Sequence, residues 1–191
     1  MNLRVTLSVI LAIFVGLVVF SQLNKPPKID QTKDIYSKLV GEQAPDFNVA
    51  NNFNSQTSLK SLRGKKVVLF FNEGLTCYPA CWNQIAELGK DSSLNNDNVA
   101  TVSIVPNEAV DWTSAFQRQP ALAKETILYD ASLTVAKAYG VTELPSSMHK
   151  GIQPGHTYVI LDKQGIVRYT YDDPKMGIEN ELLKKELDKI E

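Results

Sequence analysis

The chain has 191 residues, only two cysteines and a formal net charge of −1 at pH 7. The first forty residues hold five of the basic and two of the acidic side chains, which leaves 15 basic and 19 acidic side chains for the remainder. This mildly acidic balance has no basic stripe and argues against nucleic-acid binding. The remainder is long enough for one domain with a sizeable core.

Residues 1–24 are predicted to be an N-terminal signal anchor or transmembrane helix. An apolar run from Val5 to Phe20 is near the lower length limit for a spanning helix and is longer than most signal-peptide cores. No small-x-small cleavage site precedes Gln22, which favours a retained anchor over a cleaved peptide. Residues 25–40 are polar and are predicted to be a linker. We expect a single-pass cell-membrane protein with its domain on the extracytoplasmic side, where a cysteine pair can cycle or stay oxidised.

Residues 41–191 alternate between strand and helix patterns. Strands are predicted at 47–50, 67–71, 99–105, 126–129, 157–161 and 166–171, and helices at 58–62 (a single turn), from the cysteines to about 90, at 108–117, 132–139 and 178–190. This order indicates an α/β three-layer sandwich. Its central sheet is expected to be mostly parallel, with an antiparallel C-terminal hairpin.

Cys77 and Cys81 stand between a buried strand and the helix after it. The positive end of the helix dipole stabilises a thiolate there. Residues four apart share a helix face, with Cα atoms roughly 6 Å apart, so the pair can form a readily reduced disulfide. Pro79 in the first turn would leave Cys77 at the N-cap as the exposed nucleophile and Cys81 as the buried resolving thiol. The alternatives are two buried core thiols or a structural staple, and a staple would close too small a loop to stabilise the fold much.

Four further residues are candidates for supporting roles. Thr76 would cap the helix or donate to a bound oxygen, and Glu73 would accept a proton from Cys81 or be solvated. Trp82 would form part of a docking surface or belong to the core. His156 would stabilise the thiolates or bind a metal from a facing loop, or be structural. No ligand set for zinc is evident.

Two sequence strings resemble a known group of proteins. Gly41–Phe47 and Leu59–Leu69 are similar to the redoxin branch of the thioredoxin-like superfamily, which holds the AhpC/TSA peroxiredoxins and the TlpA-like thiol-disulfide oxidoreductases. Ala138–Val141 and Tyr158–Gly165 resemble its later landmarks. The resemblance runs from Gly41 to the C-terminus and implies a thioredoxin-like redoxin domain over 41–191 and a thiol-dependent oxidoreductase.

The details of the site differ among these subfamilies. Cys77 falls at the nucleophile position of a TlpA-like protein, with three intervening residues instead of two. Tyr78 takes the place of the peroxiredoxin threonine, and His156 follows Pro154 and Gly155 where the peroxiredoxin arginine is expected. The cysteine spacing also resembles Sco-type copper chaperones, which would imply copper ligands at Cys77, Cys81 and His156.

Four hypotheses follow. We favour a membrane-anchored extracytoplasmic thiol-disulfide oxidoreductase that uses the CxxxC pair, with protein thiols or disulfides as partners. The second is a peroxiredoxin-like antioxidant peroxidase that acts on peroxide. The third is a non-enzymatic copper chaperone, and only this hypothesis calls for a cofactor. The fourth is a docking module that kept the fold and lost the activity.

Overall fold

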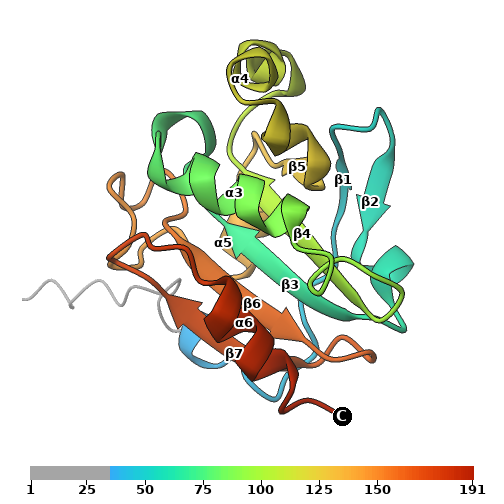
Figure 1. Cartoon of the computed structure of the whole chain (residues 1–191). Helices are drawn as coiled ribbons and strands as arrows, with labels where there is room; N and C mark the ends of the chain where they lie inside the picture. Colours follow the sequence, from blue (N-terminus) through green and yellow to red (C-terminus); the bar gives the residue numbers. More distant parts are fainter. Residues whose placement is uncertain (1–34) are drawn as a thin grey trace, which may run out of the picture. The chain divides into compact units, whose positions relative to one another are not determined.

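The structure is a computed structural model that describes residues 35–191 (Figure 1). Its strands are β1 (Asn48–Ala50), β2 (Gln56–Ser58), β3 (Lys66–Phe71), β4 (Val99–Val105), β5 (Ile127–Tyr129), β6 (Thr157–Leu161) and β7 (Val167–Asp172). Its α-helices are α3 (Ala80–Lys90), α4 (Thr113–Arg118), α5 (Thr134–Ala138) and α6 (Asn180–Leu187), and its 3₁₀ helices are η1 (Leu59–Leu62), η2 (Gly74–Thr76), η3 (Ala109–Trp112) and η4 (Pro120–Lys124). Each predicted strand is present, and β2 is an addition that pairs with β1 in a small separate sheet.

The central sheet has the strand order β5-β4-β3-β6-β7. β3 is parallel to β4 and β4 to β5, whereas β6 is antiparallel to both β3 and β7. The antiparallel C-terminal hairpin and the parallel alignment of β3, β4 and β5 are confirmed, but the sheet is mixed, because β6 is also antiparallel to β3. The reason lies in residues 139–156, which follow the five-residue helix α5. They lead the chain to the end of the sheet where β3 finishes, so that β6 enters from there and runs the opposite way.

Both faces of the sheet are buried. Val67, Leu69 and Phe71 belong to a buried cluster that includes side chains of α5, while Val68 and Phe70 belong to a second cluster with side chains of α3 and α6. Successive strand residues point to opposite faces, so a strand covered on both sides is apolar throughout. Figure 1 shows α3 and α6 on one side of the sheet and α5 on the other. The predicted α/β sandwich is confirmed.

The folded part of the chain begins before the predicted boundary at residue 41. Leu39 is buried in the same cluster as α5, and Tyr36 packs against that cluster. The Gly41 amide donates a hydrogen bond of 2.8 Å to the Val167 carbonyl. The end of the predicted linker therefore belongs to the domain, while its residues 25–34 lie outside the described part of the chain.

Four segments meet at the end of the sheet where β3 finishes, which we call the redox end. Phe71 pairs with Ile104 of β4 and with Thr157 of β6, and Thr157 pairs with Asp172 of β7. The segments that follow β3, β4 and β7 therefore leave the sheet at this end, and the segment before β6 enters it here. The two cysteines and His156 belong to these segments.

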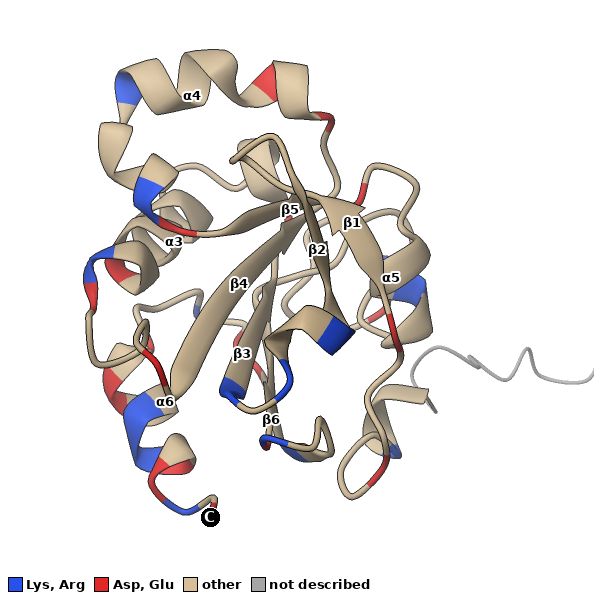
Figure 2. Cartoon of the chain, turned by 90° about the vertical axis from the view of Figure 1, so that its right-hand side faces the viewer, with Lys and Arg blue, Asp and Glu red and all other residues tan. Residues whose placement is uncertain are grey.

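Charged residues lie mainly on helices and turns. The strands β3, β4, β5 and β6 contain no charged residue except Lys66 at the start of β3, and both signs are interspersed on α3 and α6 (Figure 2). Within residues 35–191, none of the helices has the length and apolar character needed to cross a membrane. The predicted anchor, residues 1–24, lies outside the described residues.

Candidate redox site

Cys77 and Cys81 form a disulfide, with their Cα atoms 5.4 Å apart. Cys77 ends η2, and Cys81 is the second residue of α3, whose N-cap is Pro79. The helix therefore starts later than the sequence indicated, so that Cys81 and not Cys77 is the cysteine at the positive end of the helix dipole. The Cα separation lies well inside the range that disulfides adopt, so the backbone accommodates the bond.

The oxidised pair is shielded from solvent. Cys77 is 2% exposed and Cys81 is fully buried, whereas Tyr78 between them is 59% exposed. Pro79 is exposed as well. The prediction of an exposed Cys77 is therefore wrong for the oxidised pair: both cysteines turn inward, and the residues between them turn outward.

His156 meets the pair from the facing segment, as the sequence suggested. Its ring is fully buried, and its Nδ1 lies 3.7 Å from Sγ of Cys81. Phe70 of β3 packs against the ring at a centroid distance of 4.6 Å. The two sulfurs and one imidazole nitrogen all lie within 4.8 Å of one another. The structure thus brings Cys77, Cys81 and His156 together.

The other ring nitrogen fixes the protonation pattern of His156. Nε2 lies 2.8 Å from the Tyr158 hydroxyl and 3.1 Å from the Gly177 carbonyl oxygen. A carbonyl can only accept, so the tautomer that satisfies Gly177 carries its proton on Nε2 and leaves a lone pair on Nδ1. Burial lowers the pKa of His156 from 6.5 to about 4, against the opposing effects of the Asp173 charge and the Gly177 carbonyl. At neutral pH the ring is therefore an uncharged base that faces Cys81.

Tyr158 and Asp173 support this arrangement and were not identified from the sequence. Asp173 is fully buried and accepts hydrogen bonds from the amides of Lys175 (2.9 Å) and Gly177 (2.7 Å), which shapes the turn that presents the Gly177 carbonyl. The Tyr158 ring stacks on Phe70. Tyr158 could have been found, because residues two apart in a strand share a face and it is two residues after the histidine. Asp173 could not have been found, because only the folded chain brings its amide to the His156 carbonyl, at 2.9 Å.

The Glu73 carboxylate has partners other than the cysteines. It is buried, and its Oε1 accepts hydrogen bonds from the amides of Met148 (2.6 Å) and His149 (3.2 Å) and from the Ser147 hydroxyl (3.3 Å). Oε2 lies 3.1 Å from Nδ1 of His149. Both expectations for Glu73, a proton acceptor for Cys81 or a solvated side chain, are therefore replaced by a structural role. The carboxylate ties residues 72–79, between β3 and α3, to residues 147–149, and we call residues 72–79 the redox loop.

Thr76 caps η2 instead of α3. Its hydroxyl lies 2.9 Å from the Glu73 carbonyl oxygen, and this contact closes the short helix on itself. The same hydroxyl lies 3.1 Å from Oε1 of Gln153, in the segment before β6. Thr76 is exposed at this junction.

Trp82 belongs to the core and not to an open surface. It is 4% exposed, its ring packs against Trp112, and its indole nitrogen donates to the Gly74 carbonyl at 3.3 Å. The exposed aromatic ring of the loop is Tyr78, which meets Trp82 edge-on at 5.1 Å. The guanidinium of Arg118 lies over both rings, at 5.4 Å from Tyr78 and 5.6 Å from Trp82.

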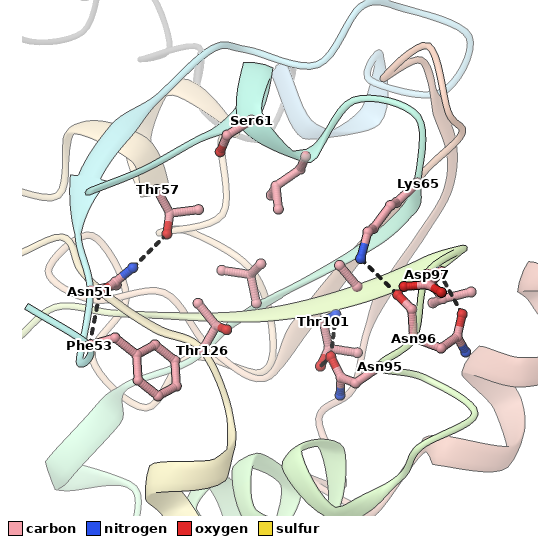
Figure 3. A pocket seen from close by; sticks show the side chains of 14 residues that line it. Asn51, Phe53, Thr57, Ser61, Lys65, Asn95, Asn96, Asp97, Thr101 and Thr126 are labelled. Atoms are coloured by element: carbon pink, nitrogen blue, oxygen red, sulfur yellow. Dashed lines mark hydrogen bonds between the residues drawn. The ribbon is translucent and has the colours of Figure 1, made fainter. Parts of the chain in front are cut away.

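A separate hollow of about 460 Å³ lies beside the first half of β4, between β2, η1 and the 95–97 turn (Figure 3). Its amide groups are already used by the fold. Asn95 Oδ1 accepts from the amide and hydroxyl of Thr101, and Asn96 Oδ1 accepts from the amide of Val99. Lys65 donates to the Asn96 carbonyl at 2.8 Å. The bonds to Asn95 and Asn96 satisfy the amides of Thr101 and Val99 in the half of β4 that β5 does not reach.

The fold and the buried cysteine pair define a redox protein of the thioredoxin-like class. The model of the AhpC/TSA family matches residues 40–170, and the chain belongs to this family. The redoxin resemblance of the sequence is thereby confirmed, and with it the class of thiol-dependent oxidoreductase.

Individual relatives and solved structures agree with this assignment. The chain is 29% identical over 133 residues to chloroplastic peroxiredoxin Q of Triticum aestivum (70% of this chain, 58% of that protein). It is 27% identical over 153 residues to a putative peroxiredoxin bcp of Coxiella burnetii (73% of this chain, 91% of that protein). The fold is similar to that of reduced Plasmodium vivax 2-Cys peroxiredoxin, with a TM-score of 0.66 at 21% identity over 79% of this chain and 81% of that one. An Aquifex aeolicus peroxiredoxin-like protein gives a TM-score of 0.63 at 17% identity (78% and 86%).

Proposed function

We propose that the chain is a thiol-disulfide oxidoreductase whose Cys77–Cys81 pair cycles between dithiol and disulfide. The observation that carries the proposal is the contact between Cys81 and the uncharged Nδ1 of His156, 3.7 Å from the sulfur. This contact gives one of the two thiols its own proton acceptor. It favours Cys81 as the resolving thiol and leaves Cys77 to react with the partner.

The exchange proceeds in two steps. The Cys77 thiolate attacks one sulfur of a partner disulfide, which forms a mixed disulfide and releases one partner thiolate. His156 Nδ1 then takes the proton of Cys81, whose thiolate attacks Sγ of Cys77. The Cys77–Cys81 disulfide forms, the second partner thiolate leaves, and the proton on His156 passes to it. Two electrons move from the pair to the partner, and the reverse sequence oxidises a partner dithiol.

Trapping tests this proposal. A Cys81→Ser chain should accumulate mixed disulfides through Cys77, because the resolving step is removed. A Cys77→Ser chain is the matched control and should trap far less partner under the same conditions. Equal trapping by both variants, or by neither, would contradict the assignment of the two roles.

Peroxide reduction is a second candidate, favoured by the peroxiredoxin relatives. A Cys77 thiolate would attack the peroxide oxygen, become a sulfenate and release the alcohol or water. Cys81 would then condense with the sulfenic acid and expel water. Arg118 lies over the rings of Tyr78 and Trp82, so polarisation of the peroxide would fall to His156 or to backbone amides. Peroxide and disulfide turnover measured side by side on the same reduced chain separates the two candidates.

A copper site is a third candidate, because the ligand atoms of Cys77, Cys81 and His156 lie within 4.8 Å of one another. Two thiolates and an imidazole form a soft donor set that suits copper. The reduced chain would bind one copper ion, and His156→Ala would weaken the binding. Stoichiometric binding combined with no turnover of disulfide or peroxide would favour copper delivery over catalysis.

The proposed location is the cell membrane, with the domain on the extracytoplasmic side and residues 1–24 as a retained single-pass anchor. The support comes from the sequence of residues 1–24 alone. The full chain should sediment with membranes and resist extraction by salt and alkali, whereas a chain that lacks residues 1–24 should not. Release of the full chain by salt would contradict the anchor.

A further inference from the structure

Two groups with different hydrogen-bonding properties contact the same nitrogen of His156. The Tyr158 hydroxyl lies 2.8 Å from Nε2, and the Gly177 carbonyl oxygen lies 3.1 Å from it. A carbonyl oxygen only accepts a hydrogen bond, whereas a hydroxyl can also donate one. Nε2 can therefore be satisfied in two ways, with a proton that it donates to Gly177 or with a lone pair that accepts from Tyr158.

The choice between these two states decides which group of His156 faces Cys81. A neutral imidazole carries one proton, so a proton on Nε2 leaves a lone pair on Nδ1, and a proton on Nδ1 removes it. Nδ1 lies 3.7 Å from Sγ of Cys81. Only the tautomer with its proton on Nε2 can take the proton of Cys81, because the other tautomer directs an N–H group at the sulfur. The Gly177 carbonyl thus favours the tautomer that can act as a base, and the Tyr158 hydroxyl favours the one that cannot.

The Tyr158 hydroxyl is always present as a donor. The side chain is fully buried, and its ring stacks on the rings of Phe70 and Tyr171 at centroid distances of 4.8 and 6.2 Å. Burial raises the pKa of Tyr158 well above its ordinary value, and the charges of Glu179 and Asp173 raise it further. The hydroxyl therefore keeps its proton at neutral pH. Another feature of the site must favour the bond from Nε2 to Gly177.

Asp173 supplies this feature by placing the Gly177 carbonyl. Its carboxylate accepts hydrogen bonds from the amides of Lys175, at 2.9 Å to Oδ1, and Gly177, at 2.7 Å to Oδ2. The Tyr171 hydroxyl lies 3.5 Å from Oδ1. The amide of Asp173 donates to the His156 carbonyl at 2.9 Å. These bonds tie the turn that carries Gly177 to the residue whose ring it contacts.

A second buried aspartate, Asp162, shows in what way Asp173 is different. Asp162 is 3% exposed and accepts hydrogen bonds from the amides two and four residues later, as Asp173 does. The charge of Asp162 is paired with Arg168 at 2.7 Å, whereas none of the ion pairs within residues 35–191 involves Asp173. Burial lowers the pKa of His156, and the charge of Asp173 opposes that effect. The negative charge of Asp173 therefore favours retention of a proton by the ring.

We propose that Asp173 is a positioning residue that holds His156 in the tautomer with its proton on Nε2, so that Nδ1 can take the proton of Cys81. This proposal rests on the proposed disulfide exchange and adds a residue to its second step. In that step the Cys81 proton moves to Nδ1, the Cys81 thiolate forms a bond to Sγ of Cys77, and the bond from Cys77 to the partner sulfur breaks. The proton then passes from the ring to the partner thiolate. Asp173 gains and loses no proton.

Dithiodipyridine tests the effect on rate, since its thiopyridone products absorb light. The reduced full chain should release the first product in a phase whose rate rises with reagent concentration, and the second, through attack by Cys81, in a phase whose rate does not. Asp173→Asn leaves one oxygen for two amides and removes the charge. It should slow the second phase by roughly tenfold, a part of the 10²-fold or more that a general base contributes, and leave the first phase unchanged. Asp162→Asn is the matched control, because this buried aspartate lies in the turn at the opposite end of β6 and should alter neither phase.

Nitrogen NMR tests the tautomer directly, because the shifts of Nδ1 and Nε2 depend on which of them carries the proton. The chain has only one other histidine, His149, so the signals that are missing from His156→Asn belong to His156. At neutral pH the unaltered chain should carry the proton on Nε2, and Asp173→Asn should shift the population towards the tautomer with the proton on Nδ1. The double variant Asp173→Asn, Tyr158→Phe lacks the competing hydroxyl. It should return the proton to Nε2 and recover most of the second-phase rate, a rescue that a merely structural role of Asp173 does not predict.

Three results would overturn the inference. The first is a proton on Nδ1 in the unaltered chain, which requires no variant to fold. The second is a second phase that is slowed equally by Asp173→Asn and Asp162→Asn, and the third is a double variant that stays as slow as Asp173→Asn. An unaltered reduced chain that shows no second phase would instead overturn the proposed function, because Cys81 would not resolve the mixed disulfide.

Discussion

His156 has a separate role for each of its two ring nitrogens. Nε2 is engaged by the Gly177 carbonyl and the Tyr158 hydroxyl, which fix the orientation of the ring, while Nδ1 faces Cys81. The packing role of His156 can be distinguished from its role as a proton acceptor. This needs a substitution that keeps a polar side chain at residue 156 but cannot accept a proton at neutral pH.

His156→Asn makes this separation. We expect the release of the second partner thiolate to slow by roughly 10²-fold at pH 7, because Cys81 loses its general base. The rate should recover as the pH rises past the ordinary thiol pKa, roughly 8.5, where Cys81 ionises unaided. Single-turnover measurements of the mixed disulfide across pH would show the change, and an unaltered pH profile would assign His156 to packing alone.

The buried imidazole also makes stability depend on pH. The pKa of His156 is about 4 in the folded chain and 6.5 when unperturbed, so the unfolded chain binds the extra proton first as the pH falls. His156 alone therefore removes about 3 kcal/mol of stability as the pH falls from 6.5 to 4. Other buried groups, such as Glu125, have the opposite pH dependence, so the measurement is a comparison: in urea unfolding at several pH values the oxidised protein should lose about 3 kcal/mol relative to His156→Asn over this range. An identical slope in the two proteins would show that the histidine is not responsible.

The sequence identified His156 but misjudged Glu73, and the difference has a physical cause. His156 directly precedes a strand adjacent to the one that leads into the cysteines, so strand pairing alone brings it near them. The direction of the Glu73 side chain depends on amides of Met148 and His149, more than seventy residues later. Local patterns carry no information about such a contact.

At the scale of elements, the Glu73 carboxylate holds the segment before β6 against the redox loop. Glu73→Ala would leave the Met148 amide without its acceptor and the His149 amide with only the Ser147 hydroxyl, 3.1 Å away, at a cost of about 1–3 kcal/mol. We expect faster hydrogen exchange at these two amides, with the amides of β6 unchanged. Glu181→Ala is the control, since that side chain is 90% exposed. Unchanged exchange at both amides would show that the loop does not need the carboxylate.

Glu125 joins the segment after η4 to β4. It is buried beneath the hydroxyls of Thr101 and Ser103, at 2.8 and 3.3 Å, and burial raises its pKa from 4.5 to about 8. Between these two values the folded chain holds a proton that the unfolded chain has lost. Stability should therefore fall as pH rises from 4.5 to 8, by about 1.4 kcal/mol per pH unit from this residue. Glu125→Gln should flatten that slope in urea unfolding, and a slope unchanged from the unaltered protein would locate the effect elsewhere.

The strands and helices could be predicted because their apolar periods are local, but the antiparallel pairing of β6 with β3 could not. The run Val67–Phe71 is apolar throughout, which is sufficient to identify a doubly covered strand. The antiparallel entry of β6 depends on the path of residues 139–156, which have no apolar period of their own and follow contacts at the redox end. The sequence also placed the start of α3 too early, with Cys77 as its N-cap, whereas α3 begins at Ala80. The inward turn of Cys77 depends on tertiary packing, which local patterns do not show.

At the scale of the molecule, the first described residues and the cysteine pair lie at opposite ends of the sheet. The chain enters the domain where Gly41 bonds to Val167, and Val167 pairs with Leu161, which in turn pairs with Val67 at the start of β3. The cysteines follow the other end of β3.

This entry segment also contributes to the stability of the domain. A chain of residues 41–191 would lack Leu39, which is 5% exposed in the core, and Tyr36, which packs beside it. We expect it to be less stable to urea than residues 35–191 by about 2–5 kcal/mol, the range for removing a buried leucine side chain. Leu39→Ala in the longer chain should reproduce most of the loss, whereas Val40→Ala, at a residue that is 53% exposed, should not. If the two lengths unfold at the same urea concentration, residues 36–39 act as a linker after all, and the domain begins at residue 41 as its sequence pattern indicates.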